Sequence, residues 1–297
     1  MRVLLIGGTG QVGQEVRALS LPDDVEVVAP SRAMLDLRDS PAIARTIASE
    51  PWSAVINAAA YTDVDRAEGE ESVTFAVNAQ APVRLAEETG SRGIPLVHIS
   101  TDYVFDGRKG APYVEKDKPA PLNVYGRSKL AGEEGIRVGN PRHIILRSSW
   151  VYSAYRKNFV HTILRLAAER TQLRVVADQR GCPTAAGDIA SACLEIAVRC
   201  ASERAQMPYG TYHFAGAGET TWFEFARTII DLAADRLDRI PSVLAISTHD
   251  HPTPALRPAD SRLDCSAIVR TFGIRPRPWQ QPLIETIDRL LTKKGKL

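Results

Sequence analysis

The chain begins with an apolar run, a glycine-rich turn and a helical pattern in direct succession. Val3 to Ile6 is rich in β-branched and leucine residues, and glycines that include Gly7, Gly10 and Gly13 follow it at once. From Gln11 to Leu19, apolar residues recur at spacings of three and four, which is typical of a helix. A strand that passes through glycines into a helix predicts the first unit of a parallel α/β sheet.

The same alternation of strand and helix continues through the first half of the chain. The further strands that we expect are Val25 to Ala29, Ala54 to Asn57, Leu96 to Ser100 and Ile144 to Arg147. The further helices are Pro41 to Ser49, Phe75 to Arg92 and Val124 to Val138. Because near-continuous apolar strands are typical of sheets covered on both faces, we expect a doubly wound parallel sheet of the Rossmann type.

After about residue 150 the pattern loosens. Helices are expected from Asn158 to Glu169 and from Asp188 to Cys200, and a strand from Thr211 to Ala215. Prolines between His249 and Pro258 exclude a continuous helix or a central strand there, so this segment is expected to be an ordered loop. We expect a first domain of residues 1–149, which also receives the segment near 188–215, and a smaller α/β lobe of residues 150–297.

Composition excludes several classes of protein. The 297 residues are 44% hydrophobic and 24% charged, as in an ordinary globular protein, and a net charge of +2 gives little attraction for nucleic acid. The four cysteines form no CxxC pair, which favours a reducing compartment. No uncharged apolar run approaches the roughly 20 residues of a membrane helix, and the apolar start is too short for a signal peptide. We expect a cytoplasmic protein without a nucleic-acid or membrane partner.

The glycine turn is suited to a dinucleotide. Gly7, Gly10 and Gly13 satisfy the GxxGxxG spacing, and Gly8 in place of Gly7 satisfies GxGxxG. Glycines let the backbone approach a pyrophosphate, whose charge is met by the amides of Gln11 and its neighbours at the helix N-terminus. The alternative is a tight turn that binds nothing, but the strand before the turn and the helix after it favour cofactor binding.

The end of the second strand bears on which dinucleotide would bind. An enzyme that uses NADH usually carries an acidic residue there, about 20 residues after the glycines. This chain has Ser31 and Arg32 instead, a hydroxyl and a guanidinium that suit a ribose phosphate. The pair favours NADPH, with NADH possible, although Arg32 alone could also be an ordinary solvated charge.

A tyrosine and a lysine lie four residues apart at the start of an expected helix. Tyr125 and Lys129 therefore share one helix face. A phenol with an ordinary pKa of about 10 is a poor proton exchanger at neutral pH, and a nearby cation would lower that pKa. Ser100 and Thr101 end an apolar strand, at the sheet edge where ligands bind, and a hydroxyl there can hold a carbonyl. This order of motifs favours hydride transfer to a ketone over a pair of surface residues.

The residues so far resemble the extended short-chain dehydrogenase/reductase family and, within it, the dTDP-4-dehydrorhamnose reductases. The resemblance covers nearly the whole chain, and the broad family shares the glycine turn and the Tyr–Lys pair. Two stretches are more specific: Arg147 to Tyr152, which holds a tryptophan after the fifth expected strand, and the proline-arginine loop Pro252 to Pro258. The resemblance implies NADPH-dependent reduction of the 4-keto group of dTDP-4-dehydro-L-rhamnose, in the synthesis of a cell-surface polysaccharide precursor.

The resemblance also implies roles for individual residues. It implies that NAD(P)H is bound by Gly10, Gln11 and Val12, by Asp36 and Leu37 near the adenine, and by Ala60, Tyr61 and Thr62 along the nicotinamide side, with Tyr125 and Lys129. The glycine turn itself adds Gly7 and Gly13 to the expected cofactor contacts. The implied substrate residues are Thr101, Asp102 and Trp150. We add Tyr103, and Arg257 for the diphosphate, although this guanidinium could equally be structural. Thr101, Tyr125 and Lys129 are the expected catalytic residues.

The sequence says less about metal binding and about the oligomeric state. Some reductases of this kind form a magnesium-bridged dimer through glutamates, but this chain keeps Glu15 and has Gly187 where a second glutamate would be expected. We therefore expect no metal, and either a monomer or a homodimer. His249 and His251 lack a third zinc ligand and are expected to be solvated, and His98, inside an apolar strand, is expected to be a core residue.

Three competing functions follow from the same motifs. Related sugar-nucleotide dehydratases carry two carboxylates after the strand-end threonine, whereas this chain has Asp102 and Tyr103, so net reduction is favoured over dehydration or epimerisation. Reduction of another 4-keto-6-deoxysugar nucleotide stays open. A third hypothesis is a non-catalytic subunit, because these reductases also resemble the accessory subunit of methionine adenosyltransferase.

Overall fold

A parallel sheet forms the larger part of the molecule. In the computed structural model, which describes residues 1–203 and 207–294, a six-stranded sheet has the order β10-β5-β4-β3-β1-β2, and every neighbouring pair is parallel. Its strands are β1 (Arg2–Ile6), β2 (Glu26–Val28), β3 (Ala54–Asn57), β4 (Leu96–Thr101), β5 (His143–Ser148) and β10 (Gly210–His213). The predicted doubly wound fold is confirmed.

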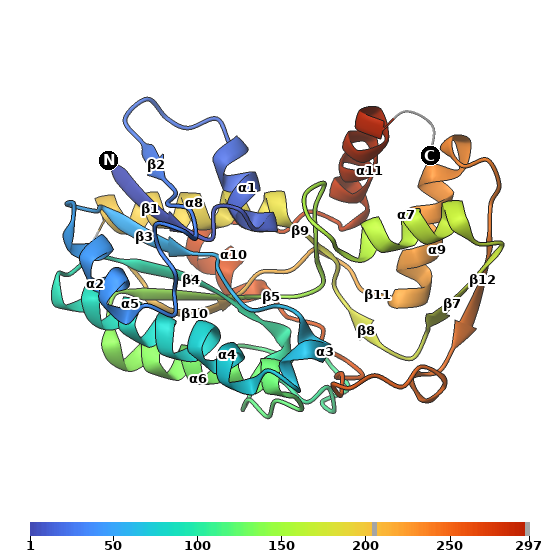
Figure 1. Cartoon of the computed structure of the whole chain (residues 1–297), viewed down its shortest axis with the longest axis horizontal. Helices are drawn as coiled ribbons and strands as arrows, with labels where there is room; N and C mark the ends of the chain where they lie inside the picture. Colours follow the sequence, from blue (N-terminus) through green and yellow to red (C-terminus); the bar gives the residue numbers. More distant parts are fainter. Residues whose placement is uncertain (204–206, 295–297) are drawn as a thin grey trace.

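Helices cover both faces of this sheet (Figure 1). One face carries α1 (Gln11–Ala18), α8 (Ala186–Ser202) and α10 (Ser266–Phe272), and the other carries α2 (Ser40–Ala48), α5 (Ala81–Ser91) and α6 (Val124–Gly139). The reason is visible in β1, where Val3 and Leu5 enter one apolar core while Leu4 and Ile6 enter the other. Strands with two apolar faces are stable only between two helical layers. We call this unit the sheet lobe.

The remaining elements form a second unit, which we call the C-terminal lobe (Figure 1). It contains α7 (Phe159–Glu169), α9 (Trp222–Ala233) and α11 (Gln280–Lys294), with β7 (Gln172–Val176) paired to β12 (Ser242–Ile246). Two short pairs join it to the sheet lobe: β6 (Val151–Tyr152) with β9 (Thr184–Ala185), and β8 (Arg180–Gly181) with β11 (Thr220–Thr221). A separate apolar core holds it together, including Phe225, Ile229 and Leu283.

The chain crosses back into the sheet lobe after residue 185. α8 packs on α1, β10 extends the sheet beside β5, and α10 adds Ile268 and Phe272 to the same core. The predicted helices after residue 150 and the strand near 211 are confirmed, whereas β7, α9, β12, α10 and α11 were not predicted. The proline-containing segment 249–258 is irregular apart from the end of a short 3₁₀ turn, η4 (Thr248–Asp250), as predicted.

One predicted helix is interrupted. The sequence predicted a continuous helix from Phe75 to Arg92, but the structure has α4 (Glu71–Phe75), a π-helical turn η1 (Ala76–Gln80) and then α5. A π turn inserts an extra residue and is frequent at functional sites. Here it directs the buried Asn78 toward the edge of the sheet.

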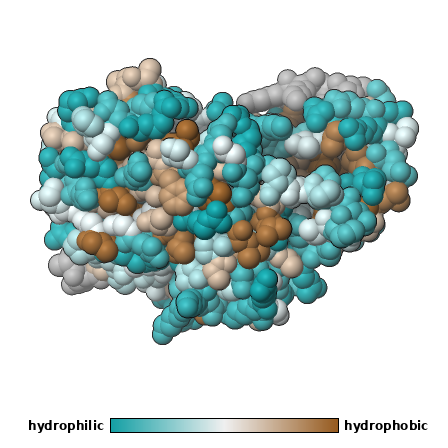
Figure 2. Space-filling model, turned by 60° about the horizontal axis from the view of Figure 1, so that its bottom comes forward, coloured by the Kyte–Doolittle hydropathy of each residue, from teal (hydrophilic) through white to brown (hydrophobic). Residues whose placement is uncertain are grey.

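Within the described residues, no helix is both long enough and apolar enough to span a bilayer. Figure 2 shows the apolar residues of one face in small, separate groups among hydrophilic ones. Exposed apolar side chains that include Met34, Val138 and Leu256 come from well-separated parts of the chain.

Candidate active site

The carboxyl ends of four strands meet at one edge of the sheet, where ligands bind in folds of this kind. In register, Ile6 of β1 lies beside Asn57 of β3, and Asn57 lies beside His98 of β4. Thr101 of β4 in turn lies beside Ser148 of β5. The segments that follow these strands, which carry most of the predicted site residues, therefore lie along the same edge.

The glycine turn after β1 leaves no room for side chains. Gly7 has φ +86°, and a Cβ on it would lie 2.6 Å from the Ala59 nitrogen, while a Cβ on Gly13 would lie 2.1 Å from the Gly7 oxygen. Gly10 donates its N–H to the Gly7 oxygen at 2.9 Å and caps α1 without a side-chain hydrogen bond. The close backbone packing that glycine allows holds the first N–H groups of α1 at the end of β1, an arrangement that fits a dinucleotide pyrophosphate.

The predicted adenine-side residues lie after β2. Ser31 and Arg32 are exposed there, and Leu37 packs partly buried against the apolar core of the sheet lobe. Asp36 accepts hydrogen bonds from Arg38 at 2.6 and 3.1 Å, and this guanidinium lowers the pKa of Asp36 to about 2. The charge of Arg32 also lowers the pKa of Asp36, so two arginines lie near this carboxylate.

The segment after β3 is fixed by a residue that sequence reasoning missed. Ala60 and Tyr61 are half-buried and Thr62 is exposed. The Asn78 oxygen accepts the N–H of Tyr61 at 2.8 Å, and the Asn78 amide donates to the Tyr61 oxygen at 3.0 Å and to Ser128 Oγ at 3.1 Å. Asn78 therefore ties the predicted nicotinamide side to α6. No local sequence pattern marks it, because its place depends on the π turn.

Helix α6 brings Tyr125 to the end of β4. Asn123 caps the helix by accepting the N–H of Gly126 at 2.8 Å. A Cβ on Gly126 would lie 2.3 Å from the Tyr103 oxygen, so glycine is required for this close approach. Tyr125 is 9% exposed, and its ring meets that of Tyr103 edge-on with centroids 5.6 Å apart.

Burial keeps Tyr125 protonated. Burial raises the pKa of Tyr125, a hydrogen bond with Thr101 lowers it, and the charge of Asp102 raises it again. The resulting pKa is about 12. Thr101 Oγ1 accepts the N–H of Tyr103 at 3.2 Å and donates to Asp102 Oδ1 at 3.1 Å. Burial raises the pKa of Asp102 to about 7, and its Oδ2 has no hydrogen-bond partner among the described residues.

Lys129 contacts a different set of atoms from the one we expected. It is 1% exposed, and its Nζ donates to the Ile99 oxygen at 2.7 Å and lies 3.1 Å from His98 Nε2. Burial lowers the pKa of Lys129 to about 8, while the charge of Glu133 raises it. Burial of the phenol dominates and raises the pKa of Tyr125, so the effect of Lys129 on that pKa stays a prediction.

A buried ion pair lies behind the catalytic candidates. Glu133, one turn after Lys129 on α6, is 0% exposed and accepts from Arg147 of β5 at 2.6 and 2.9 Å. It also accepts from Ser100 Oγ at 2.6 Å, so Ser100 points away from the substrate side. Burial raises the pKa of Glu133, but the hydrogen bonds and charges of Arg147, Ser100 and Arg137 together lower it by more, so the net shift is downward. An arginine inside the apolar run of β5 is the sequence signal that could have indicated this pair.

The predicted substrate residues beyond β4 have partners within the chain. Trp150 follows β5 in a left-handed conformation with φ +46°, and its ring stacks on Trp222 of α9 at 3.5 Å between centroids. A Cβ on Gly181 would lie 2.3 Å from the Trp150 ring. Arg257 Nη2 donates to Asp65 Oδ2 at 2.8 Å, which joins the late loop to α3 (Val64–Ala67). Neither side chain points freely into solvent.

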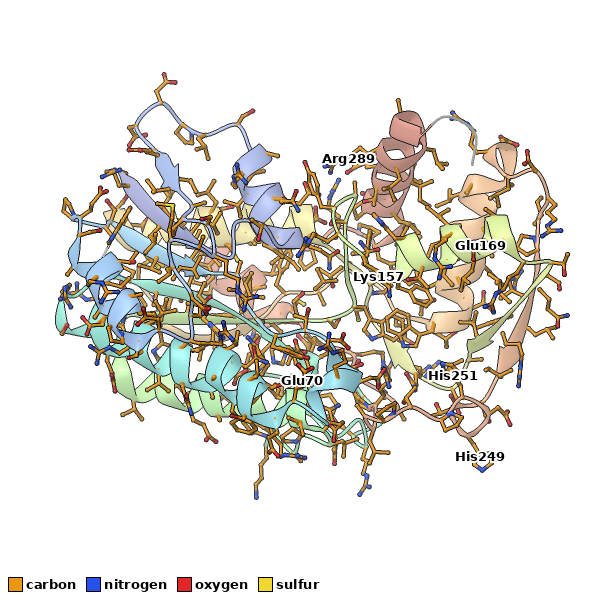
Figure 3. The ribbon with its side chains drawn as sticks, viewed as in Figure 1. Glu70, Lys157, Glu169, His249, His251 and Arg289 are labelled. Atoms are coloured by element: carbon orange, nitrogen blue, oxygen red, sulfur yellow. The ribbon has the colours of Figure 1, made fainter. Side chains whose placement is uncertain are left out.

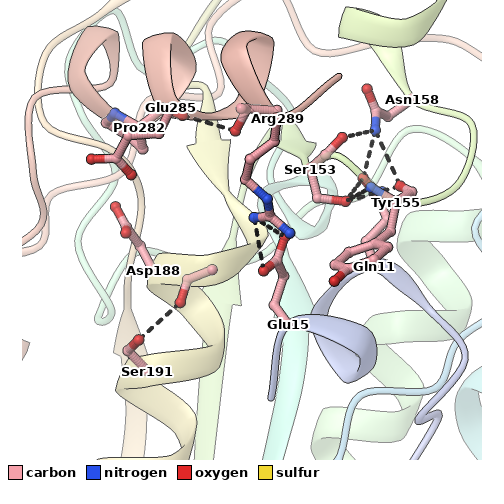
Figure 4. Close-up of polar contacts among 12 residues, drawn as sticks. Gln11, Glu15, Ser153, Tyr155, Asn158, Asp188, Ser191, Pro282, Glu285 and Arg289 are labelled. Carbon is pink, nitrogen blue, oxygen red and sulfur yellow. Dashed lines mark hydrogen bonds and ion pairs between the residues drawn. The ribbon is translucent and has the colours of Figure 1, made fainter. Parts of the chain in front are cut away.

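Gln11 and Glu15 of α1 connect the two lobes (Figure 4). The Gln11 oxygen accepts from Asn158 at 2.9 Å, and Glu15 accepts from Arg289 of α11 at 3.0 and 3.2 Å. Figure 3 places Arg289 on the side of α11 that faces α1. The carboxylate that a metal would need is thus held by a guanidinium, and a Cβ on Gly187 would lie 3.8 Å from Glu15 Oε2.

Metal ligands are not gathered elsewhere either. In residues 1–203 and 207–294, no group of three or more His, Cys, Asp or Glu side chains is placed to hold a metal ion. His249 and His251 are exposed, as expected, and Figure 3 shows them on the outer loop of the C-terminal lobe. His98, in contrast, is a core residue with a polar role, because it contacts Lys129.

Comparison with known proteins identifies the family of the chain. The RmlD substrate binding domain family matches residues 1–292. A dTDP-4-dehydrorhamnose reductase of Sinorhizobium fredii is 44% identical over 291 residues, which cover 98% of each chain. Among solved structures, the enzyme of that name from Clostridium acetobutylicum superposes with a TM-score of 0.90 at 35% identity, covering 98% of this chain and 99% of that one.

A second solved structure adds a ligand to the comparison. The dTDP-4-dehydrorhamnose reductase of Bacillus anthracis, in complex with NADP, has a TM-score of 0.89 at 33% identity, covering 97% of this chain and 98% of that one. The family match, the full-length identity and the shared fold all point to the same family. The chain belongs to the RmlD family of dTDP-4-dehydrorhamnose reductases.

Proposed function

We propose that the protein catalyses the NADPH-dependent reduction of the 4-keto group of dTDP-4-dehydro-L-rhamnose to dTDP-L-rhamnose, in the cytoplasm. The observation that carries the proposal is the buried phenol of Tyr125 beside Thr101, at the sheet edge that begins with the glycine turn. A protonated phenol in that place is the acid that a ketone needs as it is reduced. Relatives named for this activity match the chain over nearly its whole length.

The residues present fit NADPH, and bound NADPH supplies the hydride. We assign the pyrophosphate to the amides at the start of α1, which the closely packed glycine turn holds at the end of β1. Ser31 and Arg32 would meet the ribose phosphate. The remaining proposed contacts are Gly7, Gly10, Gln11, Val12, Gly13, Asp36, Leu37, Ala60, Tyr61, Thr62, Tyr125 and Lys129.

Tyr125 then serves as the proton donor. Its raised pKa keeps the hydroxyl protonated across the neutral range, so the acid is loaded before reaction. Thr101 orients the keto oxygen, and Tyr125 gives its proton to that oxygen as negative charge develops there. Lys129 lies one helical turn away from Tyr125. When the Lys129 side chain carries a positive charge, it stabilises the phenolate that remains after proton transfer.

We assign the sugar nucleotide to the seam between a dinucleotide-binding domain of residues 1–149 and a substrate lobe of residues 150–297. Asp102 and Tyr103 would contact the sugar from the sheet lobe and Trp150 from the other side. Arg257 would bind the diphosphate, for which its guanidinium must exchange Asp65 for phosphate oxygens. The segment 188–215 belongs with the first domain.

The other candidate functions have less support. A dehydratase or epimerase needs a second acid or base, and the position after Asp102 holds Tyr103. Burial raises the pKa of this phenol above its ordinary value, so it is a poor base. A non-catalytic subunit would leave the buried Tyr125, Thr101 and Lys129 without a role. Reduction of another 4-keto-6-deoxysugar nucleotide uses the same groups and is the closest alternative. We propose catalysis without magnesium, because the Glu15 carboxylate is paired with Arg289. We also propose that the protein is a monomer or a homodimer.

One assay tests the proposal. The purified protein is mixed with NADPH and dTDP-4-dehydro-L-rhamnose, and both the nicotinamide absorbance and the sugar nucleotide product are followed. We expect one NADPH consumed for each dTDP-L-rhamnose formed. Product without loss of NADPH would indicate an enzyme that recycles its nicotinamide. No turnover of this or any 4-keto-6-deoxysugar nucleotide would overturn the proposal.

A further inference from the structure

The segment 153–158, which leads from β6 to α7, lies against the start of α1 (Figure 4). The Gln11 oxygen accepts from Ser153 Oγ at 3.2 Å and from Asn158 Nδ2 at 2.9 Å. Asn158 also donates to the Ser153 oxygen at 2.8 Å, which closes the segment into a compact loop. We call residues 153–158 the seam loop, because they cross from the C-terminal lobe to the sheet lobe.

A second contact holds the seam loop one turn further along α1. Arg289 of α11 pairs with Glu15, and the same guanidinium lies over the ring of Tyr155, 5.2 Å from its centroid. Glu15 is only 7% exposed, so the pair is partly shielded from water and salt. Two successive turns of α1 therefore fix where the middle of the seam loop lies.

The middle of the seam loop carries two positive charges. Arg156 and Lys157 are exposed, and neither forms an ion pair with a residue that the structure describes. No acidic residue occurs between Arg147 and Arg165 in the sequence. Figure 3 shows Lys157 between the two lobes. Two cations without an ionic partner therefore lie where the lobes meet.

Arg156 has a backbone conformation that its side chain makes costly. Its φ is +60°, and Trp150 is the one other non-glycine residue with a positive φ in the described part of the chain. A residue with a Cβ rarely adopts this conformation, whereas glycine adopts it readily. Residues held in this way cluster at ligand sites, which favours a role for the Arg156 guanidinium over simple solvation.

The seam loop faces the helix end to which the cofactor pyrophosphate is assigned. The side chain of Gln11 already spans the gap between them, and lysine and arginine side chains are longer. Because the Gln11 oxygen serves the loop, its Nε2 keeps two N–H groups, which bond to no residue that the structure describes. The carboxylate of Glu15, one turn away, is already paired. Donors and positive charges thus converge on the start of α1.

We propose that Arg156 and Lys157 bind the pyrophosphate of the dinucleotide from the C-terminal lobe, opposite the backbone amides of the glycine turn, with Gln11 Nε2 as a further donor. Charge-assisted hydrogen bonds to phosphate oxygens suit both side chains. This inference rests on the proposed function for the identity of the cofactor. It makes the C-terminal lobe part of the cofactor site as well as of the sugar-nucleotide site.

The first test measures dinucleotide binding without substrate, by the fluorescence of NADPH and of NADH. Lys157→Gln and Arg156→Gly should each raise both dissociation constants by about fivefold, since one exposed charge is lost. The ratio of the two constants should not change, because both cofactors carry the pyrophosphate. Unaltered binding in both variants, or a changed ratio that places the charges at the ribose phosphate, would overturn the proposal.

The matched control is Arg170→Gln. Arg170 is exposed at the far end of α7 on the same lobe, so the variant loses one positive charge away from the seam loop. Both dissociation constants should stay within about twofold of the wild-type values. A loss as large as that in Lys157→Gln would mean that only the overall charge of the lobe matters and would contradict a local contact.

The same variants are titrated with dTDP alone, because a sugar nucleotide also carries a diphosphate. Binding of dTDP should stay within about twofold of the wild-type value. A loss of dTDP affinity equal to that of NADPH, or larger, would assign the charges to the substrate and overturn the proposal. If the wild-type protein binds neither NADPH nor NADH, the proposed function fails too. If it binds them and the variants bind equally well, this inference alone fails.

Thermal unfolding separates binding from structure at Arg156. Arg156→Gly relieves the left-handed strain, so Tm should stay or rise while the affinity for NADPH falls. Arg156→Lys keeps the charge and should bind NADPH more tightly than the glycine variant does. A fall in Tm together with the affinity, or equally weak binding by the lysine and glycine variants, would show that arginine only shapes the loop and would overturn its assignment.

Discussion

In the sheet lobe, the side chains proposed to perform chemistry are buried and held from several elements, whereas in the C-terminal lobe those proposed to bind substrate lie at partly exposed seams. Tyr125 and Lys129 are locked between α6 and β4 by backbone and side-chain contacts. Trp150 and Arg257 instead rest on Trp222 and on Asp65 of the same chain. The reacting groups are preorganised by the sheet, and the binding groups can exchange partners.

The largest effect is expected where the sheet lobe supplies the proton. Tyr125→Phe removes the hydroxyl and leaves the ring in its buried place, so turnover should fall by about a thousandfold. The affinity for NADPH, measured by fluorescence quenching, should stay within about twofold because the glycine turn is untouched. A variant that retains near wild-type turnover would remove Tyr125 from the mechanism.

The buried ion pair tests the rigidity of the sheet lobe. Glu133→Gln leaves the Arg147 guanidinium uncompensated, so the free energy of unfolding should fall by about 3–5 kcal/mol. Denaturant unfolding followed by circular dichroism measures this. The exposed neighbour Glu134 supplies the control, and Glu134→Gln should change stability by less than about 0.5 kcal/mol. Equal effects of the two substitutions would mean that the pair does not support the site.

Asp102 makes the free energy of unfolding depend on pH. Its folded pKa of about 7 exceeds the unfolded value of 3.8, so the folded protein binds more protons between these values and loses stability as pH rises. Asp102→Asn removes this loss. We expect the variant to gain, relative to wild type, on the order of 2–4 kcal/mol of unfolding free energy from pH 4 to pH 8. A pH-independent difference would contradict the buried, protonated carboxyl.

A substitution in the C-terminal lobe should change substrate binding more than the chemical step. Trp222→Leu removes the ring on which Trp150 stacks, so KM for the sugar nucleotide should rise by about tenfold while kcat changes less than about twofold. Steady-state kinetics separate the two parameters. A loss confined to kcat would mean that this aromatic pair acts on the reacting centre and would erase the distinction between the lobes.

The smallest effect is expected at the exposed end of β2. Arg32→Ala should lower the preference for NADPH over NADH by about fivefold, since a solvent-exposed guanidinium contributes modestly to binding a phosphate. The ratio of kcat/KM for the two cofactors measures the preference. An unchanged ratio would assign Arg32 to the solvated surface.

The sequence predicted the sheet lobe well because its strands are apolar on both faces and each is followed by a helical period. Much of the C-terminal lobe was missed for identifiable reasons. In α9, Phe225, Ile229 and Ala233 repeat at helical spacing, and this pattern was overlooked. β7 alternates, with Leu173 and Val175 buried, but it is short and pairs with β12 across a long stretch of chain, and Leu244 of β12 is exposed.

The candidate site was predicted where motifs are local and missed where contacts are long-range. Tyr125 and Lys129 share a helix, and the glycine turn is continuous in sequence. Asn78 depends on a π turn that no spacing rule indicates. His98 was assigned to the core because it lies in an apolar strand, and only its contact with Lys129 reveals the polar role.

A structure of the protein with NADP⁺ and dTDP-L-rhamnose would test the central claim most directly. The account predicts that the Tyr125 hydroxyl lies within about 2.6–3.2 Å of the sugar O4, with Thr101 beside the same oxygen and the nicotinamide on the side of Ala60. A sugar bound away from the carboxyl end of β4, with Tyr125 still enclosed by protein, would contradict it.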